Sequence, residues 1–170
     1  MKLVKPTHQN RDQVMAYRTT FLNLGEHPYG GTSLQNFEDY NRWLNQVVDQ
    51  EKGDNLPDER VPATQFVSIV NGKLVGLINI RHRLSPELLI ESGHIGYSIH
   101  PDERRKGYAT EQLRLGLVEA KKLGLKKVLI TCDKANVASA KTIQKNGGIL
   151  ENEVISSDTN EVVQRFWIET

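Results

Sequence analysis

The chain of 170 residues is long enough to bury the core of one domain without disulfides or metals, so we expect a single domain over residues 1–170. Its 22 basic and 21 acidic side chains nearly cancel, and no overall charge favours a nucleic acid or a membrane surface as partner. A single cysteine, Cys132, excludes an internal disulfide and is typical of a reducing compartment. We expect a cytoplasmic protein, because no apolar leader or membrane-spanning run is visible.

The first part of the chain is predicted to form one short strand and two helices. Residues 2–4 are apolar enough for a strand, which a proline then ends. Residues 9–24 carry apolar side chains at spacings of three and four, as an amphipathic helix does. After a loop over residues 26–32 with one proline and two glycines, Ser33 is placed to cap a second helix with apolar positions in residues 37–48.

A hairpin follows a polar stretch. Residues 52–62 are interrupted by glycine and proline and predict a surface connection. Residues 65–70 and 73–80 then flank Asn71 and Gly72. Because Asn-Gly tolerates the positive φ angles of a type I′ turn, this segment is predicted to be a β-hairpin.

The second half alternates strands and helices, most of them bounded by glycine, proline or aspartate. The predicted elements are strands over 94–99 and 127–132, helices over 105–123 and 137–145, and final strands over 149–156 and 162–168. The whole order is βααβββαβαββ, which indicates an α/β (α+β) fold with a mixed sheet of six to seven strands flanked by helices.

One segment joins a strand end to a basic loop and a helix start. Its residues in order include Ile99, Arg104, Arg105, Lys106, Gly107, Tyr108, Ala109 and Thr110. A helix start offers free backbone N–H groups and the positive end of the helix dipole, which together bind phosphate. Gly107 lets the backbone approach a ligand, Ala109 leaves the first turn uncrowded, and Thr110 adds a hydroxyl donor. The segment favours an anionic, phosphate-bearing ligand.

This segment resembles the GNAT superfamily of N-acetyltransferases. The family's hallmark is Arg/Gln-x-x-Gly-x-Gly/Ala between the fourth strand and the third helix, matched here by Arg104, Gly107 and Ala109. The preceding strand ends in Val/Ile-x-Pro, matched by Ile99 and Pro101. The resemblance therefore implies a GNAT fold and acetyl-CoA as cosubstrate, held by the segment from Ile99 to Thr110.

A second motif extends the resemblance, which covers about residues 65–151. In the family, an asparagine after the fifth strand and the small residue three places later contact the pantetheine and phosphate part of coenzyme A; they correspond to Asn136 and Ser139. Asn136 also suits the simpler role of a helix N-cap. Within the superfamily, the chain looks most like a bacterial group with a Gly-His-Ile-Gly-Tyr strand, here beginning at Gly93.

The resemblance implies transfer of the acetyl group to a primary amine of a small molecule or peptide by direct attack. Backbone N–H near Ile99 would polarise the thioester carbonyl. His94 stands where many relatives have a glutamate base, and an imidazole titrates near neutrality. Glu91 is the carboxylate alternative, and a histidine that is merely packed on a strand is the competing interpretation of His94.

The general acid departs from the family pattern. Many relatives have a tyrosine seven residues after the asparagine, and Ile143 occupies that position here. Tyr108, Ser139 or solvent would then protonate the leaving thiolate, while alternation directs Tyr97 toward the core. The missing tyrosine keeps an alternative function open, a GNAT-fold coenzyme A-binding or protein-interaction module with weak or no catalysis.

In this family the first two helices and their loop wall the acceptor site. The residues placed there are Glu26, His27, Tyr29, Glu38 and Asp39, whose three carboxylates suit a cationic amine. No nucleic-acid partner is expected from three basic residues in a row, and scattered histidines with one cysteine predict no metal site. Exposed edges of the terminal strands are compatible with a homodimer.

Overall fold

A computed structural model of the chain describes residues 1–53, 56–57 and 60–170, so parts of the predicted surface connection over 52–62 lie outside the described residues. The strands are β1 (Lys2–Val4), β2 (Ala63–Val70), β3 (Lys73–Arg81), β4 (Ile95–Ile99), β5 (Lys127–Asp133), β6 (Ile149–Ile155) and β7 (Val162–Glu169). The helices are α1 (Arg11–Asn23), α2 (Tyr40–Lys52), α3 (Tyr108–Lys122) and α4 (Val137–Lys145). The predicted order βααβββαβαββ is confirmed.

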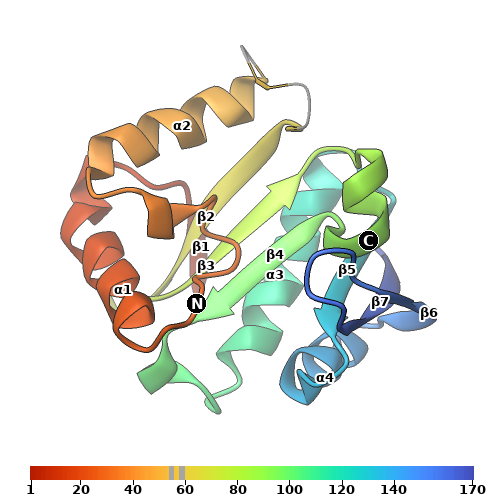
Figure 1. Cartoon of the computed structure of the whole chain (residues 1–170). Coiled ribbons are helices and arrows are strands. Elements are labelled where there is room, and N and C mark those ends of the chain that lie inside the picture. Colours follow the sequence, from red (N-terminus) through yellow and green to blue (C-terminus); the bar gives the residue numbers. More distant parts are fainter. Residues whose placement is uncertain (54–55, 58–59) are drawn as a thin grey trace.

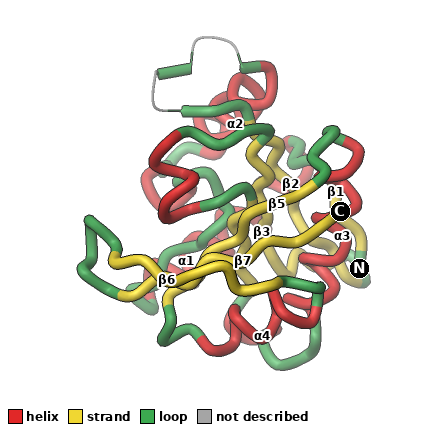
Figure 2. The backbone as a smooth tube through the Cα atoms, turned by 90° about the vertical axis from the view of Figure 1, so that its right-hand side faces the viewer, coloured by secondary structure: helices red, strands yellow, loops and turns green. Residues whose placement is uncertain are grey.

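The strands form two antiparallel sheets, ordered β1-β2-β3-β4 and β5-β7-β6. Strands β4 and β5 lie next to each other where the two sheets meet (Figure 1). Helices α2 and α3 lie on opposite sides of the strands (Figure 2). One core cluster joins α1 and α2 to β2 and β3, and a second joins α3 and α4 to β3, β5 and β7.

The β2–β3 hairpin forms as predicted. Asn71 and Gly72 have φ angles of 48° and 80°, the positive values that a type I′ turn requires. The strands pair from Ala63 with Arg81 to Val70 with Lys73, with one irregularity near Ser68. This hairpin carries Arg81 to the far end of β3, beside the start of β4.

The prediction that Ser33 caps the second helix is wrong. Ser33 has a φ of 58° and precedes a short 3-10 turn, whereas α2 begins later with Asp39 as its N-cap. The Asp39 carboxylate accepts a hydrogen bond from Asn41 N at 2.8 Å. The Trp43 indole donates to the carbonyl of Gly31 at 2.8 Å, so the intervening loop folds back on α2 and buries Leu34.

Helix α3 packs closely on β3 at a glycine. A Cβ added at Gly116 would lie 2.6 Å from Cδ1 of Ile78, whose side chain is fully buried. We expect Gly116→Val to lower the free energy of unfolding by about 1–3 kcal/mol, because a packed core has no room for the added methyl groups. Urea unfolding measures this loss.

The matched control is Val118→Leu on the exposed side of the same helix. It is expected to change stability by no more than about 0.5 kcal/mol. Equal stability of the two variants would show that α3 and β3 are not in close contact at Gly116.

Candidate active site

Strands β4 and β5 are joined at one end and separate at the other. His94, just before β4, donates its backbone N–H to the Leu129 carbonyl at 2.7 Å, and Leu129 N donates to His94 Nδ1 at 2.9 Å. Beyond this junction no ladder joins β4 to β5 in the described residues. A cavity of about 200 Å³ opens there, and we call it the cleft. Its lining includes Ile95, Gly96, Tyr97, Thr131, Cys132, Asp133, Asn136 and Ser139.

The separation leaves backbone groups of both strands free to bind a ligand. In β4, His100 donates its N–H to β3, and alternation then turns the N–H groups of Tyr97 and Ile99 away from β3 toward the cleft. The same alternation on β5, whose other edge pairs with β7, turns Thr131 and Asp133 toward the cleft. The cleft therefore offers two rows of backbone donors and acceptors.

The predicted phosphate-binding loop leads from β4 into α3. Arg105 and Gly107 have φ angles of 63° and 81°, so the helix begins at Tyr108 and not at Arg105 as predicted. The backbone N–H groups of residues 105–108 donate to no described residue. No atom lies within 4 Å of a Cβ added at Gly107, which leaves space for a ligand at the positive end of α3.

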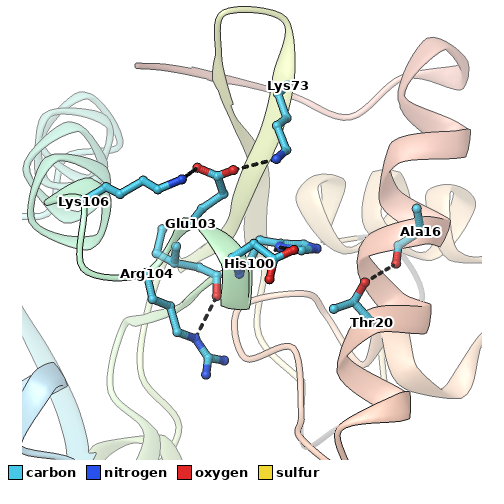
Figure 3. A network of polar contacts seen from close by, with 9 residues as sticks. Ala16, Thr20, Lys73, His100, Glu103, Arg104 and Lys106 are labelled. Atoms are coloured by element: carbon cyan, nitrogen blue, oxygen red, sulfur yellow. Dashed lines mark hydrogen bonds and ion pairs between the residues drawn. The ribbon is translucent and has the colours of Figure 1, made fainter.

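Arg104 turns its side chain away from this anion site. Its guanidinium forms a two-point ion pair with the Glu26 carboxylate, with Nη1 to Oε1 at 3.2 Å. It also donates through Nε to the Ile99 carbonyl at 3.4 Å (Figure 3). Glu26 lies in the loop after α1, so this pair joins that loop to the phosphate loop.

Glu103 holds the phosphate loop on its other side. Its carboxylate accepts from Lys73 Nζ at 2.6 Å and from Lys106 Nζ at 2.8 Å (Figure 3). These two ammonium groups lower the pKa of Glu103 to about 2. Lys106 is thus engaged by Glu103, while Arg105 is exposed and is in no ion pair with a described residue.

A second cavity, of about 480 Å³, adjoins the cleft, and we call it the outer cavity. It is lined by the loop over residues 27–33 and by α2, β3 and nearby segments, and it shares Tyr29, Gly30 and Arg81 with the cleft. The loop lies tightly on β4, since a Cβ at Gly30 would be 2.2 Å from the Gly96 carbonyl oxygen. Ser98 Oγ also donates to the Tyr29 carbonyl at 2.6 Å.

Only part of the predicted acceptor wall lines the outer cavity. His27 and Tyr29 do so. Glu26 is paired with Arg104, Asp39 caps α2, and Glu38 is exposed and does not line the cavity. None of the three carboxylates that were expected around the acceptor lines the outer cavity.

The predicted catalytic residues are not brought together. His94 is 6% exposed, lines neither cavity, and receives a hydrogen bond on Nδ1, while burial and Arg81 lower its pKa. Glu91 lines the cleft, but Ser157 N and Ser156 Oγ donate to its carboxylate at 2.8 and 2.7 Å and lower its pKa. Tyr108 begins α3 and lines neither cavity.

A tyrosine hydroxyl reaches the cleft from a different element. Ile143, at the position expected for tyrosine, is fully buried in the core. Tyr97 also packs on that core, but its hydroxyl lies 2.9 Å from Ser139 Oγ and both residues line the cleft. Burial raises the pKa of Tyr97 to about 12 and that of the Cys132 thiol to about 11. Asn136 caps α4 by accepting from Ser139 N at 3.1 Å.

Comparison with known proteins identifies the family. A sequence model described as Acetyltransferase (GNAT) domain matches residues 3–149. The chain belongs to the GNAT acetyltransferase family. No curated protein sequence matches this GNAT chain significantly.

Solved structures share the GNAT fold at low sequence identity. The microcin self-immunity acetyltransferase MccE, solved with acetyl-CoA and AMP, has a TM-score of 0.72 at 13% identity, over 99% of this chain and 91% of that one. A Salmonella typhimurium acetyltransferase that modifies the N-terminal serine of a 50S ribosomal subunit protein gives 0.72 at 12% identity, over 99% and 94%. A Vibrio cholerae spermidine N-acetyltransferase SpeG variant gives 0.67 at 16% identity, over 99% and 95%.

No described helix is long and apolar enough to cross a membrane. Among residues 1–53, 56–57 and 60–170, no group of three or more His, Cys, Asp or Glu side chains could hold a metal ion.

The contact of Gly30 with β4 can be tested against another glycine of the same loop. Gly30 and Gly25 have similar φ angles of 72° and 65°, but a Cβ at Gly25 would meet no atom within 4 Å. Both alanine variants bear backbone strain, and Gly30→Ala must also displace the β4 backbone. We expect Gly30→Ala to lose about 1–3 kcal/mol more than Gly25→Ala in urea unfolding. Equal losses would contradict the close approach.

Proposed function

We propose that this GNAT chain transfers an acetyl group from acetyl-CoA to a primary amine of a small molecule or peptide. The observation that carries the proposal is the arrangement of three features: β4 borders the cleft and leads into the loop whose N–H groups at residues 105–108 are free, and the cleft shares Tyr29, Gly30 and Arg81 with the outer cavity. Phosphates suit the loop, and the amides of pantetheine suit the free backbone groups of β4 and β5. GNAT structures solved with acetyl-CoA or coenzyme A support this choice of cosubstrate.

In the proposed complex, the thioester lies where the two cavities meet and the amine enters from the outer cavity. Backbone N–H groups of Tyr97 and Ile99 face the cleft, so they would donate to the thioester oxygen as negative charge develops on it. The amine nitrogen attacks the carbonyl carbon, and the C–S bond then breaks with its electron pair on sulfur. The protein contributes mainly by positioning the two substrates.

We assign the general acid to Tyr97 in place of the tyrosine missing at Ile143. Its hydroxyl is in the cleft beside Ser139, and its pKa of about 12 keeps it protonated at neutral pH. It would give its proton to the leaving thiolate and be reprotonated through Ser139 or water. The contacts of His94 and Glu91 make both of them poor bases, so we assign the amine proton to water in the open outer cavity.

Acetyl-CoA binding is tested with two glycines at opposite ends of α3. Gly107 and Gly124 both have positive φ and open space, so glutamate imposes similar strain at each. We expect isothermal titration to show saturable binding for the wild type and for Gly124→Glu. Gly107→Glu should lose at least about tenfold in affinity, since its carboxylate repels phosphate. Equal affinity of the two variants, or no binding by the wild type at millimolar ligand, contradicts the proposed site.

The role of Tyr97 is tested by removing its hydroxyl. With an amine found by screening for thiol release, Tyr97→Phe should lower kcat by about 100-fold, which is typical for loss of a general acid. Its affinity for acetyl-CoA should stay unchanged. The control is Tyr40→Phe, which loses a buried hydrogen bond to the Thr7 carbonyl away from both cavities. An unchanged kcat in Tyr97→Phe would remove the tyrosine from the mechanism.

Binding without turnover of any amine would favour the alternative function. The chain would then be a coenzyme A-binding module, as the absence of tyrosine at Ile143 suggests. Titration and the amine screen together separate these two functions.

A further inference from the structure

Arg81 is a positive charge placed where the two cavities meet. It ends β3 and lines both the cleft and the outer cavity. Its Nη1 donates to two backbone carbonyls, of Gly93 at 2.9 Å and Ser92 at 3.3 Å. These contacts fix one edge of the guanidinium, and no hydrogen bond from Nε or Nη2 to a described residue accompanies them.

The charge of Arg81 has no carboxylate partner in the described part of the chain. Arg104, Arg114 and Arg165 each pair with a glutamate, whereas Arg81 is in no such ion pair. Glu91 lines the same cleft, but its carboxylate accepts hydrogen bonds from Ser156 and Ser157. A guanidinium stays protonated in proteins, and a shielded charge without a counterion is costly. The missing partner is therefore expected to come with a ligand.

A second arginine lines the outer cavity. This residue is Arg60, and no aspartate or glutamate lines the cavity among residues 1–53, 56–57 and 60–170. Asn79 adds an amide, held by a hydrogen bond from its Nδ2 to Thr32 Oγ1 at 3.1 Å. A polycationic acceptor would meet repulsion here, whereas an anionic group would be attracted.

We propose that the acceptor amine carries a carboxylate or phosphate close to its nitrogen, and that Arg81 binds this anionic group. The inference rests on the proposed acetyl transfer, because it uses the same junction of the two cavities. Arginine recognises carboxylate and phosphate through paired N–H groups, which fixes the orientation of the bound anion. With the anion on Arg81, a nearby amine lies at the junction, facing the cleft that would hold the thioester. Free amino acids and small aminophosphates have this chemistry, and polyamines do not.

The test compares amines that carry the anion with amines that lack it. The purified 170-residue chain is supplied with acetyl-CoA and with one amine at a time, and kcat/KM is measured by thiol release. The amines are a set of free amino acids, the matching amino acid amides, 2-aminoethyl phosphate and spermidine. The wild type should prefer an amino acid to its amide, or the aminophosphate to spermidine, by about 10- to 100-fold, the range of a charged hydrogen-bond pair. The larger of the two preferences distinguishes carboxylate from phosphate.

Variants of Arg81 distinguish binding of the anion from structural support of the nearby turn. Arg81→Gln should bring the preference close to one, and Arg81→Lys should retain part of it. Arg114→Gln is the control, because Arg114 is exposed and paired with Glu111 at 2.8 Å. Simple distortion of the turn at Ser92 and Gly93 would lower activity toward both members of a pair and leave their ratio unchanged.

Different results would contradict the role of Arg81 and the proposed acetyl transfer. Equal use of amino acids and amides by the wild type, or a ratio that Arg81→Gln leaves unchanged, would overturn the role of Arg81 while acetyl transfer stands. If the chain binds acetyl-CoA but none of the amines causes thiol release, the transferase proposal would be overturned and the inference with it.

Discussion

Two hydrogen bonds between His94 and Leu129 determine where β4 and β5 separate, and the cleft depends on this separation. They hold β4 and β5 together at one end, and the strands then part without a ladder between them. The separation exposes backbone groups of Tyr97, Ile99 and Thr131 that a continuous sheet would have used. A histidine expected from the sequence to move protons thus has the contacts of a residue that fixes where the sheet divides.

The sequence predicted the regular elements well where local chemistry determines them. The Asn71-Gly72 turn, the helix over 137–145 and the βααβββαβαββ order all follow from turn preferences and periodicity, which act over a few residues. The start of α2 was missed because Ser33 and Asp39 are both good caps. In the structure Ser33 lies in a loop that folds back on α2, where the Trp43 indole donates to the Gly31 carbonyl, and Asp39 caps the helix.

Of the proposed site, the sequence located the parts that short motifs carry. The loop over residues 104–110 leads into α3, and Asn136 lines the cleft. The roles proposed for Tyr97 and Arg81 depend on contacts between distant elements. The Tyr97 hydroxyl contacts Ser139, 42 residues away in the sequence, and the Arg81 side chain lines two cavities. The carboxylates that the sequence suggested for the acceptor wall have other partners. Glu26, for example, pairs with Arg104, 78 residues away in the sequence.

The ion pair between Arg104 and Glu26 would link the two sites of the proposed reaction. Glu26 belongs to the loop that continues into the wall of the outer cavity, and Arg104 to the loop that offers the phosphate site. A cosubstrate bound at the phosphate loop would restrict the backbone that carries Arg104, and through the ion pair it would also restrict the loop that carries Glu26. Such thermodynamic linkage is reciprocal, because an acceptor that steadies the wall changes cosubstrate affinity by the same factor. In the proposed reaction, the two substrates would therefore be coupled through one ion pair without touching each other.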